Sequence, residues 1–152
     1  MSEILSNLWL GPVHCLFDTE FLRSNRITHV LTALEGEVVT LPLIQLQIQQ
    51  KTFLLYDLET EPIYDYFEEA VRFMEDAHNR GGNLYVHCYA GVSRSPTFVA
   101  AYLMKSRGLR AEEALEFIRE RRAIIDPNDG FRDALDRWER KLMTSAAVTA
   151  TP

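Results

Sequence analysis

The chain has 152 residues, enough for one domain with a single sizeable core. Hydrophobic residues make up 47% and charged residues 25%, as in soluble globular proteins, and the formal net charge of −6 argues against a nucleic-acid or anionic-membrane binder. No apolar run reaches the length of a membrane span, and the N-terminus lacks a secretory pattern. The two cysteines form no disulfide framework, so we expect a reduced protein of the cytoplasm or nucleus.

The first half of the chain predicts several strands and one short helix. Residues 7–11 read as a strand that ends at Gly-Pro, and residues 18–25 as a short helix. Residues 28–34 are rich in β-formers and predict a central strand. Apolar residues alternate with glutamines over 44–48, which predicts a half-exposed strand, and residues 53–58 predict an apolar one.

The second half predicts longer helices. A buried strand over 84–88 is followed by a nearly unbroken apolar run, which we interpret as a buried helix that begins at Pro96 and ends at Gly108. Apolar residues at steps of three and four predict three amphipathic helices, over 63–77, 111–122 and 131–142. Residues 1–143 therefore make one domain of the α/β class, and the small polar residues 144–152 predict a disordered tail.

The loop between the buried strand and the buried helix carries the chemistry. It contains Cys88 and, six positions later, Arg94. A strand–loop–helix turn directs backbone N–H groups towards one point at the positive end of a helix dipole, which makes an anion site. A thiol in that field favours its nucleophilic thiolate form, and a guanidinium can bind two phosphoryl oxygens at once. The loop therefore predicts a phosphate site that contains a cysteine nucleophile.

The pattern His-Cys-x-x-Gly-x-x-Arg-Ser at residues 87–95 resembles the phosphate loop of the cysteine-dependent protein phosphatases. The Ser-Arg-Ser-Pro ending at 93–96 is most similar to the dual-specificity branch. The resemblance implies a mixed, mostly parallel sheet of four to five strands flanked by helices, with the loop at the carboxyl end of the central strand, as is usual for open α/β sheets. It also implies hydrolysis of phosphotyrosine and phosphoserine or phosphothreonine in proteins, through a phosphocysteine intermediate and without a cofactor.

Each position of this loop has an expected role. The phosphate would lie in the cradle formed by Tyr89, Ala90, Gly91, Val92, Ser93 and Arg94. Gly91 is expected in a backbone conformation that favours glycine. Ser95 is expected either to donate its hydroxyl to the sulfur of Cys88 or to cap the following helix, and both roles can hold. The side chain of His87 points away from that of the cysteine on the strand, so we expect it to order the loop.

A leaving alkoxide or phenoxide needs a proton, so we expect a general acid on another segment. The candidate carboxyl groups are those of Asp57, Glu59, Glu61 and Asp65. In the resembling family the acid is an aspartate on a loop ahead of a helix with a Tyr-Phe pair. Asp57, which precedes Tyr66 and Phe67, fits this description, with Glu59 as the alternative.

Other features narrow the function. Asn128 matches a Pro-Asn-x-Gly-Phe turn that supports the phosphate loop in the family, although an ordinary turn and helix cap is the alternative. Cys15 is interpreted as buried and inert, and no histidine spacing predicts a metal site. The glutamine-rich residues 45–50 are not part of the family pattern.

The uncharged loop positions favour phosphorylated proteins as substrates over ligands with several phosphates, such as phosphoinositides or RNA 5′-triphosphates. We therefore expect no nucleic-acid and no membrane partner. Two alternatives stay open. One is a non-catalytic module that binds phosphoproteins, and the other is a phosphatase of lipid or RNA phosphates.

Overall fold

The computed structural model describes residues 1–150, and the side chains of residues 1–146. Its centre is a five-stranded sheet in the order β1-β2-β5-β3-β4. The strands are β1 (Ser2–Leu5), β2 (Leu8–Gly11), β3 (His29–Leu34), β4 (Gln49–Leu54) and β5 (Leu84–His87). Only β1 pairs antiparallel with its neighbour, so the sheet is mixed and mostly parallel with β5 in the middle, as expected.

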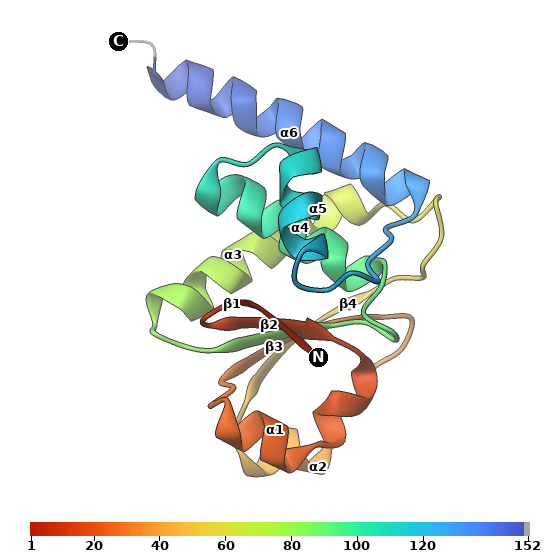
Figure 1. The fold of residues 1–152 in the computed structure, drawn as a ribbon, viewed down its shortest axis with the longest axis vertical. Helices are drawn as coiled ribbons and strands as arrows, with labels where there is room; N and C mark the ends of the chain where they lie inside the picture. The colour runs from red at the N-terminus through yellow and green to blue at the C-terminus, as the bar shows by residue number, and fades with distance from the viewer. Residues whose placement is uncertain (151–152) are drawn as a thin grey trace.

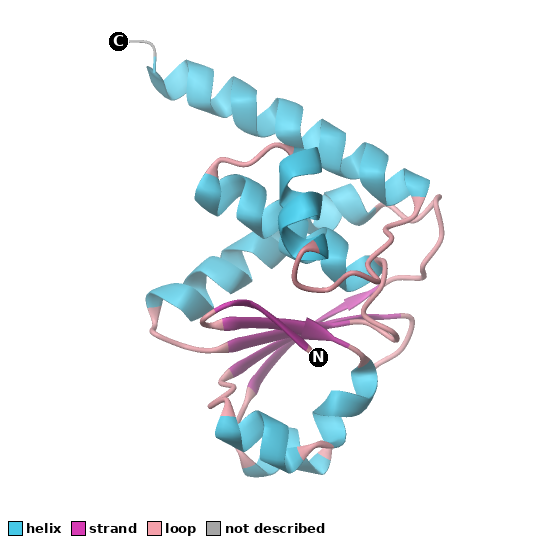
Figure 2. Cartoon of the chain, in the orientation of Figure 1, coloured by secondary structure: helices cyan, strands magenta, loops and turns pink. Residues whose placement is uncertain are grey.

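Helices cover both faces of the sheet (Figures 1 and 2). One face carries η1 (Val13–Phe17), α1 (Thr19–Ser24) and α2 (Leu41–Gln45), which share a small apolar core with Tyr85. The other face carries the larger core and the helices η2 (Ile63–Tyr66), α3 (Phe67–Asn79), α4 (Arg94–Arg107), α5 (Ala111–Arg119) and α6 (Asp129–Ala150). Within the described chain, no helix combines the length and the apolar character needed to cross a bilayer.

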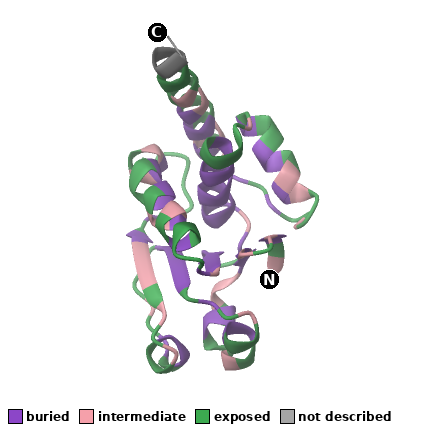
Figure 3. Ribbon diagram, turned by 90° about the vertical axis from the view of Figure 1, so that its left-hand side faces the viewer, coloured by how far each residue is buried: buried purple, intermediate pink, exposed green. Residues whose placement is uncertain are grey.

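Helix α4 is the centre of the larger core. Every residue from Ser95 to Met104 is buried, because the helix packs against the sheet and also against α3, α5 and α6. Figure 3 shows such buried residues in the interior and the exposed ones on the outward faces of the elements. The helix ends at Gly108, whose φ of +67° suits a glycine after a helix C-terminus. Its fixed position holds its first turn, and the loop before it, against the end of β5.

The structure differs from the predictions in the segment between β3 and η2. The strand predicted over 44–48 is wrong, because α2 and a turn occupy that stretch and β4 begins only at Gln49. Pro42 lies in the first turn of α2, where its missing N–H costs no hydrogen bond, and Leu43 is buried against the sheet. Strand β4 also ends at Leu54 rather than at residue 58, so Asp57 lies in a loop.

The two ends of the chain also differ from expectation. Strand β1 was not predicted; it pairs with β2 at the edge of the sheet and covers part of the core with Ile4. Helix α6 continues through most of the predicted disordered tail as far as Ala150, and residues 151 and 152 lie outside the described residues. Threonine and alanine residues in this stretch are compatible with a helix, and alanine is the strongest helix former.

Candidate active site

The loop of residues 88–93 joins the carboxyl end of β5 to the start of α4. Because β2, β5 and β3 run parallel with Gly11, His87 and Thr32 in register, three strands end beside this loop. The loops that follow β3 and β4 and the loop between α5 and α6 gather on the same side of the molecule (Figures 1 and 2). Chain topology thus brings the segments after β2, β3 and β4 and the segment between α5 and α6 around Cys88.

Five successive carbonyl groups of the loop, from Cys88 to Val92, each accept a hydrogen bond from a group on its outer side. The donors are His87 Nδ1 to Cys88 (2.9 Å), the Val13 N–H to Tyr89 (3.0 Å), Arg122 Nη2 to Ala90 (3.0 Å), Arg122 Nε to Gly91 (2.9 Å) and the Asp126 N–H to Val92 (2.7 Å).

These bonds determine where the loop amides point. In a trans peptide the C=O and the following N–H point in opposite directions, so the amides of residues 89–93 face the other side of the loop. Among the residues that the structure describes, none of these five amides donates to another atom of the chain. A row of free N–H groups followed by a helix N-terminus is an anion-binding arrangement.

Gly91 allows the loop to curve as tightly as it does. Its φ is +71°, a conformation that side-chain-bearing residues rarely adopt. A Cβ at this position would also lie 2.7 Å from the carbonyl carbon and oxygen of Gly11 and 2.8 Å from Arg122 Nη2. Gly91 therefore has the backbone conformation that the sequence predicted, and it also permits the close approach of β2 and Arg122.

Cys88 is buried, with 2% of its surface exposed, and its Sγ lies 3.0 Å from Ser95 Oγ. Helix α4 begins at Arg94, two residues earlier than a cap at Ser95 would allow, and its N-cap residue is Ser93. The prediction that Ser95 caps the helix is therefore wrong, while the alternative, a hydroxyl bonded to the cysteine sulfur, matches the geometry. That hydroxyl can stabilise negative charge on the sulfur.

His87 lies beneath the loop as a neutral hydrogen-bonding group. Its Nδ1 faces the Cys88 carbonyl, which can only accept, so Nδ1 carries the proton and Nε2 accepts from Thr32 Oγ1 at 2.7 Å. Gln50 Nε2 donates to the same Thr32 oxygen (2.9 Å) and to the carbonyl of Val38 (2.8 Å). Burial lowers the pKa of His87 to about 4, which keeps the ring neutral near pH 7. His87 thus orders the loop through its neighbours.

The guanidinium of Arg94 is bound to the chain through Nη1, and its buried Nε has no hydrogen-bond partner among the described residues. Its Nη1 donates to Glu35 Oε2 at 2.5 Å and to the Leu55 carbonyl at 3.1 Å, and only 7% of the residue is exposed. The hydrogen bond from Arg94 lowers the pKa of Glu35, which stays ionised. A buried N–H without a partner, next to five free amides, indicates a place for an oxyanion. Glu35 was not predicted from the sequence.

Asn128 connects the predicted acid to the loop. Its side-chain Nδ2 donates to Asp57 Oδ1 (2.9 Å), and its backbone N–H donates to Ser93 Oγ (3.0 Å). Its Oδ1 accepts from the Phe131 N–H, so it also caps α6, and both predicted alternatives for this residue apply. Asp57 is exposed and is placed beside the loop by this bridge.

The other candidate acids are placed differently. The backbone of Glu59 packs on Gly130, where an added Cβ would lie 2.0 Å from the Glu59 carbonyl oxygen. Glu61 accepts from the Tyr56 N–H at 2.8 Å and so shapes the loop, while Asp65 lies in η2. The geometry therefore favours Asp57 over the three alternatives.

Arg122 is a residue that the sequence analysis missed. Besides binding two loop carbonyls, its Nη1 donates to Ser2 Oγ at 3.1 Å, so it ties β1 to the loop. In the sequence it is one of two adjacent arginines at the end of a predicted helix. Nothing in that pattern distinguishes it from Arg121, whose guanidinium lies over the Phe117 ring instead.

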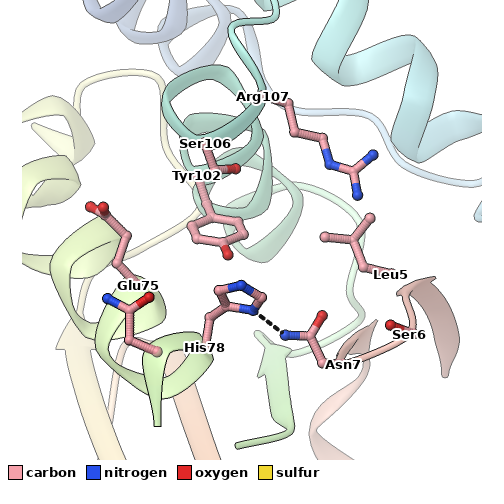
Figure 4. A pocket seen from close by; sticks show the side chains of 9 residues that line it. Leu5, Ser6, Asn7, Glu75, His78, Tyr102, Ser106 and Arg107 are labelled. Atoms are coloured by element: carbon pink, nitrogen blue, oxygen red, sulfur yellow. Dashed lines mark hydrogen bonds between the residues drawn. The ribbon is translucent and has the colours of Figure 1, made fainter. Parts of the chain in front are cut away.

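A separate cavity of about 460 Å³ lies at the other end of α4 (Figure 4). It is lined by the β1–β2 turn and by the C-terminal turns of α3 and α4, whose negative helix ends do not favour an anion. Two of its polar side chains bond to each other, Asn7 Nδ2 to His78 Nδ1 at 2.8 Å. The cavity therefore takes no part in the phosphate site. Within the described residues, no group of three metal-binding side chains is placed to hold a metal ion.

The role of Arg122 can be measured through anion binding. In Arg122→Met the carbonyls of Ala90 and Gly91 lose their donors, so the following amides are no longer held towards the anion. We expect the affinity for orthovanadate to fall roughly tenfold, the usual effect of losing hydrogen bonds to a charged donor. Arg121→Met is the matched control, because Arg121 contacts Phe117 and not the loop. Equal affinities in both variants would contradict the assigned role.

The neutral state of His87 predicts a pH dependence of stability. Its pKa is lower in the folded chain, about 4, than the ordinary value of 6.5, so the unfolded chain binds the extra proton between these values. The free energy of unfolding should therefore fall by about 3 kcal/mol as the pH drops from 6.5 towards 4. Urea unfolding of His87→Gln should show a shallower fall. If the free energies of unfolding of the two proteins fell equally with decreasing pH, the prediction would be refuted. His29 is present in both proteins and therefore cannot cause a difference between them.

Comparison with known proteins agrees with this geometry. The model of the dual specificity phosphatase catalytic domain matches residues 8–141. Dual specificity protein phosphatase 5 of Rattus norvegicus is 36% identical over 150 residues, 99% of this chain but 38% of that protein, so the chain spans well under half of its length. Dual specificity protein phosphatase 1B of Arabidopsis thaliana is 36% identical over 96% of this chain and 86% of its own.

A solved structure shows the same fold. The human tyrosine phosphatase-like serine/threonine/tyrosine-interacting protein is 31% identical, with a TM-score of 0.87 over 94% of this chain and 97% of its own. The likeness to this solved structure and the sequence matches point to the same family. The chain therefore belongs to the dual specificity phosphatase catalytic-domain family.

Proposed function

We propose that the chain is a cysteine-dependent protein phosphatase that hydrolyses phosphotyrosine and phosphoserine or phosphothreonine. One observation carries the proposal. A buried cysteine lies at the start of a loop with five free amides and a buried guanidinium N–H that lacks a partner. Membership of the family supports the choice of a phosphate ester as the substrate.

In the first step the Cys88 thiolate attacks phosphorus, and the bond from phosphorus to the ester oxygen breaks. Asp57 gives its proton to the leaving oxygen, so the product is a neutral alcohol or phenol. The amides of 89–93 and the guanidinium of Arg94 bind the three non-bridging oxygens, whose spread charge they stabilise in the transition state. The product of this step is a phosphocysteine on Cys88.

In the second step a water molecule attacks the phosphocysteine, and the Asp57 carboxylate takes the proton of that water. The phosphorus–sulfur bond breaks, inorganic phosphate is released and Cys88 returns to the thiolate. The Ser95 hydroxyl, 3.0 Å from the sulfur, donates to the departing thiolate and makes it a better leaving group. The enzyme is then ready for another turnover.

The substrates in this proposal are phosphorylated proteins of the cytoplasm or nucleus. Cys15 and Cys88 are both free thiols, which suits a reducing compartment. The loop itself offers no lysine for a second phosphate, because its variable positions are uncharged. We therefore place phosphoproteins ahead of lipid and RNA phosphates.

Activity assays test the nucleophile. The chain should hydrolyse para-nitrophenyl phosphate and phosphopeptides in the presence of EDTA, and Cys88→Ser should reduce kcat at least about a thousandfold. Cys15→Ala, a change at the other buried free cysteine, should keep the activity. Full activity in Cys88→Ser would rule out the mechanism. Tight binding of phosphopeptides by the unmodified chain without turnover would instead identify a non-catalytic binding module.

The role of Asp57 predicts a change in the pH–rate profile. The reaction needs a protonated acid and a thiolate together, so kcat/KM should pass through a maximum. In Asp57→Asn the limb along which activity falls with rising pH should disappear, and kcat for phosphoserine peptides, with their poor leaving group, should fall about a hundredfold. Glu59→Gln should keep both the limb and the rate. The reverse pattern would move the role to Glu59.

A further inference from the structure

The entrance to the phosphate loop is surrounded by exposed acidic side chains. We call them the entrance carboxylates: Glu35, Glu59, Asp126 and Asp129. They come from three of the segments that meet at the loop, namely the segments after β3 and β4 and the one between α5 and α6.

Contacts of their segments place these residues near the loop. Glu35 pairs with Arg94 while 47% of its side chain stays exposed. The backbone N–H of Asp126 binds the Val92 carbonyl, and 80% of its side chain is exposed. Asp57 is bridged to the loop by Asn128, the residue that precedes Asp129 in the chain.

Two of the entrance carboxylates are paired with arginines, Glu35 with Arg94 and Asp126 with Arg132, whereas Glu59 and Asp129 form no ion pair with the described residues. All three guanidinium nitrogens of Arg122 donate within the molecule, to two loop carbonyls and to Ser2. Arg132 donates to the Pro127 carbonyl and to Asp126 Oδ1. Arg94 donates to Glu35 and to the Leu55 carbonyl through Nη1, and its buried Nε has no hydrogen-bond partner among the described residues. Arg94 therefore keeps a donor for the phosphate, and the unpaired carboxylates of Glu59 and Asp129 face what lies around it.

Exposed apolar side chains lie among the same segments. They are Tyr56 (57% exposed), Leu58 (54%), Tyr89 (67%) and Ile124 (60%). Single exposed apolar residues are common, but here they come from the loop itself, from the segment between α5 and α6 that is hydrogen-bonded to it, and from the loop after β4 that Asn128 bridges to it. Aromatic and aliphatic side chains of this kind suit contact with apolar side chains of a peptide.

We propose that this entrance selects peptide segments in which the phosphorylated residue is flanked by lysine or arginine and by an apolar residue, and that it disfavours acidic flanks. The proposal rests on the proposed function, because it describes the substrates of that same site. The phosphate binds the loop amides and Arg94, and the basic flanks meet the entrance carboxylates. Since these charges are exposed, each contact is modest and is screened by salt.

Matched phosphotyrosine peptides test the proposal. One carries two arginines beside the phosphotyrosine, and the other carries two glutamates at the same positions. We expect kcat/KM to be about tenfold higher for the arginine peptide at low salt, and the ratio to shrink towards about twofold near 0.5 M NaCl. A soluble phosphoinositide headgroup should be turned over more slowly than either peptide.

Charge-neutralising variants locate the effect. The variant Asp129→Asn should lower the preference for the arginine peptide about twofold, with little change on para-nitrophenyl phosphate. Glu112→Gln is the matched control, because Glu112 is exposed on the first turn of α5, away from the loop, and should leave the preference unchanged.

The outcomes separate this proposal from the proposed function. If both peptides are hydrolysed equally, or the glutamate peptide faster, the entrance proposal is wrong while the phosphatase activity stands. Faster turnover of the phosphoinositide headgroup would also overturn it, in favour of a lipid phosphatase. If no phosphate ester is hydrolysed by the unmodified chain, the proposed function fails first.

Discussion

The phosphate site depends on the hydrogen bonds that hold the loop carbonyls outward. A free loop of this length would turn its peptide groups in many directions, and an anion would have to pay for ordering them. Here each of the five carbonyls from Cys88 to Val92 has its own donor, so the opposite amides are already aligned before a ligand arrives. The donors come from the segment after β2, from β5 and from the segment between α5 and α6. The site therefore forms only when distant parts of the chain have assembled, and its geometry is a property of the whole fold.

The residues beneath the loop extend this support. The hydrogen bonds run from the Cys88 carbonyl through His87 and Thr32 to Gln50, and then to the Val38 carbonyl. Val38 belongs to the segment that carries Glu35, the partner of Arg94. Because Gln50 donates to Thr32, the Thr32 hydroxyl is left to donate to His87, which in turn donates to the carbonyl of the nucleophile. A neutral histidine is required for this direction of donation, and burial supplies it by lowering its pKa. Cys88 and Arg94 are thus linked through the segment that follows β3, which contains both Glu35 and Val38.

The charge distribution explains how an acidic protein can hold a phosphate site. The net charge of −6 describes the surface as a whole, whereas the anion meets only a few local groups. Arg94 and the free amides face the phosphate, and Arg122 and Arg132 are bound to the chain itself. The carboxylates of the surrounding segments stay exposed. In the proposed site the positive groups lie close enough to bind one phosphate, whereas the exposed side chains on the surrounding segments include carboxylates. That separation is the physical basis of the discrimination that we propose between substrates with the same phosphate group.

Local sequence alone determined the fold class, the loop and its central residues. Cys88, Gly91 and Arg94 are recognisable because strand, loop and helix are adjacent in the chain and their chemistry depends on short spacings. The amphipathic helices were predictable for the same reason, since their periodicity is local. Tertiary structure decided the rest. Glu35, Gln50 and Arg122 act through contacts with residues far away in the chain, and no local pattern marks them. The strand predicted over 44–48 is replaced by the end of α2 and a turn, because burial of Leu43 against the sheet outweighed an alternating pattern. Our preference for Asp57 over Glu59 as the proposed acid likewise rests on Asn128, which only the fold brings beside the loop.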